Sequence, residues 1–300
     1  MPTHDRLETL TTIRDWIRFA VSEFRKNNLF YGHGTDNALD EAVSLIFHTL
    51  HLPYDAPPAL YDAVLTLEER KAVDDIITQR RDKKIPVAYL THEAFFMGLP
   101  FYVDERVLIP RSPIAELIQR QFSPWMDAHP VSNILDLCTG SGCIAIACAQ
   151  IFPEAHITAS DISSDALDVA RVNLEKYQLQ NQIKLVQSDV FESINPQKFD
   201  VIISNPPYVD KSDMDSLFKE YRHEPVIALA AGQDGLDIIK KILSSAKNYL
   251  SDHGILIIEA GNSAEALISQ FPGLPFTWLE FERGESEVFL LTAKQLNRLN

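Results

Sequence analysis

The sequence has little of what marks membrane, secreted or nucleic-acid-binding proteins. No uninterrupted apolar run approaches the roughly 20 residues that a membrane-spanning helix needs. The first six residues lack the basic and then apolar pattern of a signal peptide. Basic residues are scarce, with 27 Lys and Arg against 42 Asp and Glu, and the formal net charge of −15 argues against direct nucleic-acid binding. We therefore expect a soluble, cytoplasmic protein whose acidic surface is compatible with a basic protein partner or serves solubility alone.

Cysteine is scarce as well, with Cys138, Cys143 and Cys148 close together in the chain. An odd number clustered around one turn does not suit a disulfide framework. The spacing also lacks the close cysteine pair of a zinc site. We expect small buried thiols in a reduced compartment, and we assign no residue to a metal.

The length and the apolar content of 46 % suffice for about two compact domains. Residues 1–85 show helical spacing of apolar positions, with a first helix beginning near Ile13, a second over 40–51 and an exposed third over 68–81. Residues 86–110 are rich in aromatic and β-branched side chains, which predicts a β-hairpin linker that turns at residues 98–100.

Residues 111–300 alternate apolar strands with helical patterns, which predicts a doubly wound α/β domain around a parallel sheet. The final two strands follow one another directly, so a hairpin would make the last strand antiparallel. The expected strands are 134–137, 157–159, 183–186, 201–203, 255–258, 276–281 and 287–291, and the expected helices are 142–151, 164–178 and 234–250.

A glycine turn follows the first strand of this domain, in the run Asp136-Leu137-Cys138-Thr139-Gly140-Ser141-Gly142. Glycines at a strand-to-helix turn let the backbone approach a nucleoside cofactor closely. The pattern alone also describes NAD-binding folds, whereas a phosphate-binding P-loop is excluded because no Gly-Lys-Ser/Thr follows. Asp136 is expected to orient the turn and to face the amino-acid end of the cofactor.

Two acidic residues stand at the ends of the next two strands. Asp161 can accept both ribose hydroxyls of a nucleoside, or it can cap the following helix. Asp189 can bond an adenine amino group, or it can be an ordinary turn residue. The residues that we expect to bind the cofactor are Asp136, Cys138, Thr139, Gly140, Ser141, Gly142, Asp161, Asp189, Val190 and Asn205.

The run Asn205-Pro206-Pro207-Tyr208 follows the fourth strand. The Asn205 side-chain oxygen and the Pro206 carbonyl can accept both N–H bonds of a planar nitrogen, and Tyr208 can stack on that planar group. The prolines fix φ, so the direction of the carbonyl is preset. Read alone, the run could be a simple loop. Beside the glycine turn it predicts methyl transfer from S-adenosyl-L-methionine to an sp2 nitrogen, with Asn205, Pro206 and Tyr208 as the catalytic residues.

The whole chain resembles the protein N5-glutamine methyltransferases of the HemK, PrmC and PrmB group. The resemblance implies a class I methyltransferase sheet of seven strands, a helical substrate-recognition domain at 1–85, and a glutamine side chain held by Asn205 and Pro206. Pro207, Tyr208 and Arg111 complete the expected substrate site, although Arg111 could instead tie the hairpin to the sheet. The resemblance rests on residues 107–111, 136–142, 204–208, 224–225 and 232–236.

Two segments favour one branch of that group. Arg111-Ser112-Pro113-Ile114-Ala115-Glu116 departs from the Arg-Pro-x-Thr-Glu run of the release-factor enzymes, and residues 31–37 are similar to the PrmB branch. That branch methylates a glutamine of the third large-subunit ribosomal protein (L-three), a basic partner that suits the acidic chain. His33 is expected to be structural or to contact the partner, and residues 222–223 to lie in a solvated loop.

Three other functions stay open. Methylation of a release factor would use the same site. An enzyme acting on a flipped nucleic-acid base would hold the amino group of that base with the same Asn-Pro-Pro-Tyr run, but such an enzyme should have a basic surface. A binding module without catalysis would not need an intact asparagine turn beside an intact glycine turn.

Overall fold

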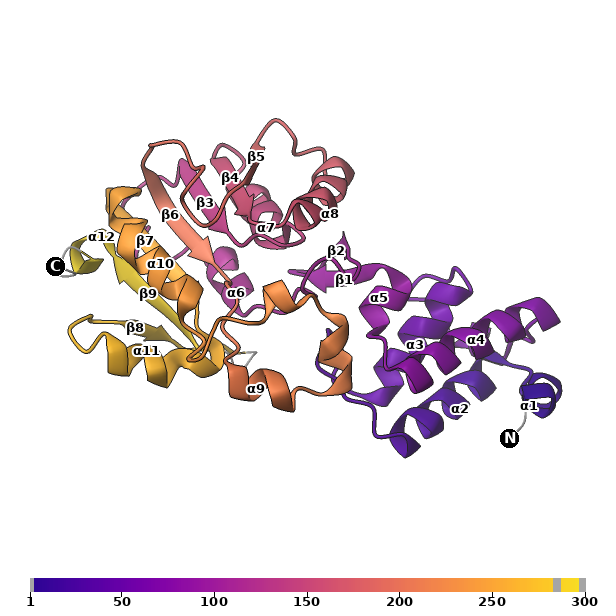
Figure 1. Cartoon of the computed structure of the whole chain (residues 1–300). Helices are drawn as coiled ribbons and strands as arrows, with labels where there is room; N and C mark the ends of the chain where they lie inside the picture. Colours follow the sequence, from indigo (N-terminus) through magenta and orange to yellow (C-terminus); the bar gives the residue numbers. More distant parts are fainter. Residues whose placement is uncertain (1–2, 283–286, 297–300) are drawn as a thin grey trace. The chain divides into compact units, whose positions relative to one another are not determined.

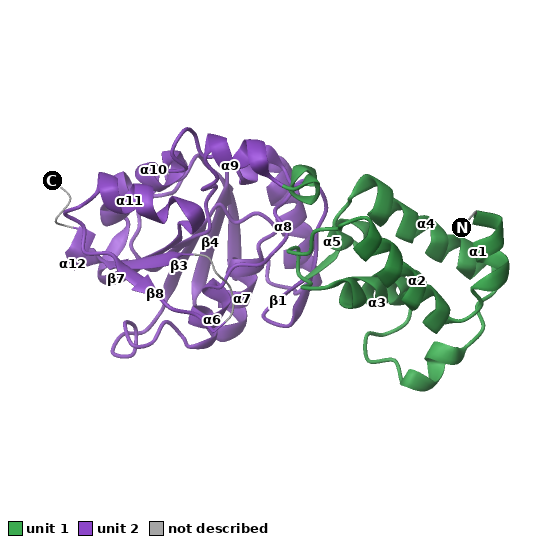
Figure 2. Ribbon diagram, turned by 90° about the horizontal axis from the view of Figure 1, so that it is seen from below, with its two compact units in different colours: residues 1–94, 218–223 green, residues 95–217, 224–300 purple. Residues whose placement is uncertain are grey.

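The computed structural model describes residues 3–282 and 287–296. The chain folds as two compact units (Figure 2). Unit 1 contains residues 1–94 and 218–223, and unit 2 contains 95–217 and 224–300. The first domain was predicted to end at residue 85, with residues 218–223 in the second domain. The structure differs because Val87 packs in the core of unit 1 and because residues 218–223 make their contacts with that unit, where Glu220 is buried.

Unit 1 is built from short helices. Thr12 with Asp15, and Thr66 with Glu69, form capping boxes that satisfy the free N–H groups at two helix starts. The helices are α1 (Thr3–Thr9), α2 (Ile13–Lys26), α3 (Ala38–Thr49), α4 (Leu67–Lys83) and α5 (Val87–Thr91), with 3-10 turns at Pro58–Asp62 and Lys219–His223.

The core of unit 1 contains fully buried aromatic side chains, among them Trp16, Phe24 and Phe47. The third predicted helix is present as α4, and most of its residues are exposed or half-buried, but one side of it packs in the unit. It buries Ile77 and also Arg80, because the guanidinium of Arg80 finds carboxylate partners inside the unit.

The predicted hairpin is shorter than expected. Its strands are β1 (Glu93–Phe96) and β2 (Leu99–Tyr102), and Met97 and Gly98 form the turn with φ of 51° and 76°. Two successive positive φ values are those of a tight hairpin turn. The turn was predicted one residue too late, and the start of the predicted hairpin is the helix α5, since a five-residue apolar run does not distinguish helix from strand.

Unit 2 contains a seven-stranded sheet in the order β5-β4-β3-β6-β7-β9-β8 (Figure 1). The first five strands of this order are parallel, and β9 runs antiparallel to both of its neighbours, β7 and β8, as predicted. The short turn predicted between the last two strands falls partly on residues 283–286, which lie outside the described residues. The strands are β3 (Asn133–Leu137), β4 (His156–Asp161), β5 (Ile183–Gln187), β6 (Phe199–Ser204), β7 (Leu250–Glu259), β8 (Thr277–Leu279) and β9 (Val288–Thr292).

Helices cover both faces of this sheet (Figure 1). One face packs on α6 (Ile114–Gln119), α7 (Cys143–Ile151) and α8 (Ser164–Lys176), and the other on α10 (Asp237–Ser245), α11 (Ala264–Gln270) and α12 (Ala293–Leu296). The predicted helix 234–250 is shorter than expected and continues as a 3-10 turn. Within the described part of the chain, we find no helix that combines the length and apolar character of a membrane span.

Candidate active site

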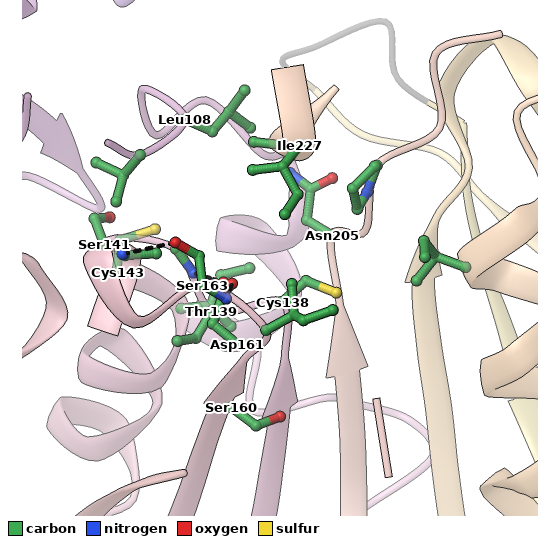
Figure 3. Close-up of a pocket in the computed structure, with 18 of the residues that line it drawn as sticks. Leu108, Cys138, Thr139, Ser141, Cys143, Ser160, Asp161, Ser163, Asn205 and Ile227 are labelled. Carbon is green, nitrogen blue, oxygen red and sulfur yellow. Dashed lines mark hydrogen bonds between the residues drawn. The ribbon is translucent and has the colours of Figure 1, made fainter. Parts of the chain in front are cut away.

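A cavity of about 190 Å³ lies at the carboxyl ends of β3, β4, β5 and β6 in unit 2 (Figure 3). Ligands of open parallel sheets bind at this edge. Most of the predicted residues line the cavity, whereas Asp136, Gly142, Pro206 and Tyr208 do not. The predicted residues in the lining are Arg111, Cys138, Thr139, Gly140, Ser141, Asp161, Asp189, Val190, Asn205 and Pro207.

The glycine turn is held from outside by Asn173, a fully buried side chain of α8. Its Nδ2 donates to the Ser141 carbonyl at 2.9 Å and to the Tyr102 carbonyl at 3.0 Å. Gly142 begins α7 with a φ of 80°, and a Cβ there would lie 3.3 Å from the Cβ of Ala170. The turn therefore requires glycine at this position both for its backbone conformation and for the approach of α8.

Asp136 lies beneath the turn rather than in the cavity lining. Its Oδ2 accepts from Thr139 Oγ1 at 2.5 Å and from the Ala145 N–H at 3.2 Å, while its buried Oδ1 has no partner among the described residues. Burial raises the pKa of the Asp136 carboxyl to about 7. Asp136 thus orients the turn as expected and keeps one oxygen unsatisfied.

Asp161 ends β4 and faces the turn (Figure 3). Its two oxygens accept from the backbone N–H groups of Gly140 and Ser163, both at 2.9 Å. Burial raises the pKa of this carboxyl. The alternative that Asp161 caps the next helix was wrong, because Ser163 is the N-cap of α8.

Asp189 stands two residues beyond the end of β5 and forms an ion pair that the sequence did not suggest. Its Oδ2 lies 2.6 Å from Nζ of Lys241, on α10. Val190, next to it, has a φ of 51°, a conformation in which a β-branched residue is strained. Strained residues of this kind cluster at ligand sites.

All six residues of β6 are buried, and the strand delivers Asn205 to the cavity. Its side chain lies across the cavity from Ser141 and Cys143, beside Ile227 (Figure 3). The Oδ1 of Asn205 is buried and has no hydrogen-bond partner among the described residues. A buried acceptor left open in this way is ready for a donor from a bound molecule.

Tyr208 does not line the cavity and packs in a cradle formed by Glu259, Gly261 and Ser263. Its hydroxyl donates to Glu259 at 3.1 Å, and its carbonyl accepts from the Ser263 hydroxyl at 2.7 Å. A Cβ on Gly261 would lie only 2.3 Å from the Tyr208 ring. The ring therefore packs on the turn after β7, which differs from the expected position stacked on a planar substrate group.

Arg111 joins two segments that border the cavity. Its guanidinium contacts the Glu224 carboxylate at 2.6 and 2.8 Å, and the same carboxylate accepts the Ile109 N–H at 3.0 Å. Arg111 also lines the cavity. The structure thus shows a tie between residues 109–111 and 224, and it leaves a substrate contact as a prediction.

Several lining residues were missed. Leu108 lies in a run that was used only for the resemblance, and Ile162 directly follows Asp161 with 49 % of its surface exposed. An exposed apolar residue after a strand-end carboxylate could have served as a signal. Ile227 and Lys241 come from remote segments and gave none. The three cysteines are free thiols, and the described residues contain no cluster of three or more His, Cys, Asp or Glu suited to a metal.

Comparison with known proteins gives consistent matches. The family model described as methyltransferase small domain matches residues 120–223. A ribosomal protein uL3 glutamine methyltransferase from Francisella tularensis subsp. tularensis is 47 % identical over 293 residues, which cover 97 % of this chain and 93 % of that protein. The protein of the same name from Neisseria gonorrhoeae is 50 % identical over 290 residues, covering 96 % and 97 %.

Among solved structures, the hMettl16 catalytic domain in complex with MAT2A 3'UTR hairpin 1 aligns with a TM-score of 0.51. The alignment covers 93 % of this chain and 91 % of that one at 16 % sequence identity. At this identity the likeness concerns the fold alone. Together with the strand order, it identifies the sheet of unit 2 as that of a class I methyltransferase.

Proposed function

We propose that this chain, which belongs to the family of the ribosomal protein uL3 glutamine methyltransferases, methylates the side-chain amide nitrogen of one glutamine in uL3. The methyl donor is S-adenosylmethionine. The observation that carries the proposal is the buried Oδ1 of Asn205, which has no hydrogen-bond partner in the described part of the chain and lies in a cavity lined also by the glycine turn and Asp161.

The residues around the cavity fit the donor. Ser141 Oγ and Asp136 Oδ1 are buried polar atoms without a partner among the described residues. Such atoms are costly unless a partner satisfies them. Ser141 lines the cavity and would bond the amino-acid end of the donor, while Asp136, beneath the turn, would act on that end through its charge. Asp161 would hold the ribose hydroxyls, and Asp189 would share its carboxylate between Lys241 and the adenine amino group. When bound, S-adenosylmethionine supplies the activated methyl group.

The acceptor side follows from the chemistry of an amide. An amide nitrogen is a weak nucleophile because its lone pair is delocalised into the carbonyl group. Asn205 Oδ1 and the Pro206 carbonyl would accept its two N–H bonds and so direct the nitrogen toward the methyl group. The nitrogen, once it has gained the methyl group that the donor would supply, would lose one proton to solvent. Positioning and electrostatics supply the catalysis.

Tyr208 and Arg111 would support this arrangement from behind. Tyr208 fixes the end of the Asn-Pro-Pro-Tyr turn through Glu259 and Ser263. Arg111 holds the segment that contributes Leu108 and Pro110 to the cavity. The formal net charge of −15 suits a basic ribosomal protein as the partner.

The test is transfer of labelled methyl groups by the purified protein to uL3, to release factors and to ribosomal RNA. We expect label on a single glutamine of uL3, located by mass spectrometry. Asn205→Ala should abolish it, while Asn181→Ala, an exposed asparagine outside the cavity lining, should not. Label on a release factor or on RNA instead of uL3 would overturn the substrate assignment. Equal activity of both variants would overturn the role of Asn205.

A further inference from the structure

Residues 218–223, here called the tether, belong to unit 1, although the chain on both sides of them belongs to unit 2 (Figure 2). The tether follows α9 (Lys211–Ser216), which itself follows the Asn-Pro-Pro-Tyr turn. It is followed directly by Glu224, the partner of Arg111. The segment from Asn205 to Ile227, here called the acceptor segment, is therefore interrupted by residues that belong to unit 1.

Glu220 is the buried anchor of the tether, with 3 % of its surface exposed. Its Oε1 accepts from the Phe30 N–H at 3.1 Å and from Arg80 Nη1 at 3.4 Å. Arg80 is fully buried, contacts Glu41 at 2.8 Å and donates to the Phe30 carbonyl at 2.9 Å. A single buried guanidinium thus joins α3, α4, Phe30 and the tether.

The residues of unit 1 that contact the tether, here called the seat, are Phe30, Gly32, His33 and Arg80. Aromatic rings make several of these contacts. Phe218 stacks on Phe30 with ring centroids 4.2 Å apart, and Tyr221 lies 4.5 Å from the ring of His33. A Cβ on Gly32 would lie 2.6 Å from the Phe30 ring and 3.2 Å from the Tyr221 hydroxyl. His33, which the sequence left between a structural and a partner-contacting role, is thus part of the seat. Residues 31–34 belong to the run that favoured one branch of the family.

Glu224, four positions after Glu220, is held in the same manner within unit 2. Each glutamate is buried, and each accepts from one guanidinium and one backbone N–H. The two attachments fix the chain immediately before Val226–Ala228, a turn whose Ile227 and Ala228 line the cavity. A segment fixed at both points loses conformational freedom before substrate arrives.

We infer that Glu220 is a positioning residue: it anchors the tether within unit 1 and so restricts the conformations of the acceptor segment, which leads from the Asn-Pro-Pro-Tyr turn to Ile227. This inference rests on the proposed function and assigns a second role to the N-terminal unit, beside recognition. Glu220 does not line the cavity, so its effect is on the placement of the turn.

The test compares Glu220→Gln with Asp74→Asn. Asp74 is a matched control, because it forms a buried ion pair with Arg6 in the same unit, with two contacts of 2.8 Å, and belongs to α4 rather than to the tether. Gly32→Ala disturbs the seat without touching either ion pair. The readouts are the melting temperature, donor affinity by calorimetry, amide hydrogen exchange of residues 205–217, and kcat and KM with uL3.

We expect Glu220→Gln and Gly32→Ala to speed exchange in residues 205–217 and to lower kcat by roughly 10- to 100-fold, with donor affinity unchanged. Asp74→Asn should lower the melting temperature alone. Equal loss of kcat in the control would mean general destabilisation and would overturn the inference. So would a raised KM at unchanged kcat, or wild-type exchange in both tether variants. If the wild type does not methylate uL3, the exchange data still decide the tether.

Discussion

Arg111 and Glu224 form a two-point ion pair, in which Glu224 is 2 % exposed and both guanidinium–carboxylate contacts are shorter than 3 Å. The carboxylate also accepts the N–H of Ile109. Residues 107–111 contribute Leu108 and Pro110 to the cavity, so one pair holds a wall of the site in place.

Arg111→Lys should weaken this wall, because an ammonium group cannot contact both carboxylate oxygens in the planar geometry of a guanidinium. We expect the free energy of unfolding of unit 2 to fall by about 1–3 kcal/mol and donor affinity to fall with it. Arg171→Lys is the control, since its pair with Asp168 is exposed and should contribute less than about 0.5 kcal/mol. Chemical denaturation and calorimetry measure both, and equal effects of the two variants would contradict the prediction.

The parts of the site that were predictable are those encoded within single segments. Strand β6 was recognisable because a strand buried on both faces is a mostly apolar run, and Asn205 follows it directly, while Asp161 ends the predicted second strand. Tyr208 was placed in the substrate site because nothing local indicated that Gly261 and Ser263 would enclose it.

The tether was not predictable from its own residues. Residues 218–223 are a short polar and aromatic run, which resembles an ordinary loop. Their assignment to unit 1 depends on Phe30 and Arg80, which lie far away in the sequence. Contacts of this kind depend on tertiary packing, which the periodicity of a short segment does not predict.

Tyr208→Phe separates the positioning role of Tyr208 from a stacking role. A stacked ring would work equally well without its hydroxyl, whereas the bond to the buried Glu259 would be lost. Without this bond the end of the turn is held less firmly, and a small misplacement of the reacting groups lowers the rate, so we expect kcat to fall by roughly tenfold. Tyr177→Phe, which removes a bond to the Pro100 carbonyl elsewhere in unit 2, should leave kcat unchanged. Full activity of Tyr208→Phe would favour stacking.

Gly261→Ala should displace the Tyr208 ring, since the new Cβ would lie 2.3 Å from it at a backbone φ of 47°. We expect a loss of stability of about 1–3 kcal/mol and a lower kcat, with donor affinity little changed. Gly273→Ala is the matched control, because a Cβ there meets nothing within 4 Å. Thermal unfolding and steady-state rates of the two variants test this prediction. Wild-type stability and kcat in Gly261→Ala would mean that the residues around the Tyr208 ring can move to accept the new Cβ.

Asp136 should make both stability and donor binding depend on pH. Burial raises the pKa of its carboxyl from 3.8 to about 7. Between these values the folded protein keeps a proton that the unfolded chain has lost, so stability without donor should fall as pH rises through this window and level off above about 7. The donor carries positive charge and favours the ionised carboxylate, so its affinity should rise with pH toward 7 and then level off.

Calorimetry at pH 6 in two buffers of different ionisation heat measures this coupling directly. We expect release of a proton from the wild type on donor binding, since the ionised form of Asp136 binds more tightly. Asp136→Asn should remove the release and weaken binding at pH 8, where the wild-type carboxylate is charged. Asp127→Asn, an exposed aspartate outside the cavity lining, should behave as the wild type. Binding heats that are independent of the buffer in the wild type would show that Asp136 is already ionised before the donor binds.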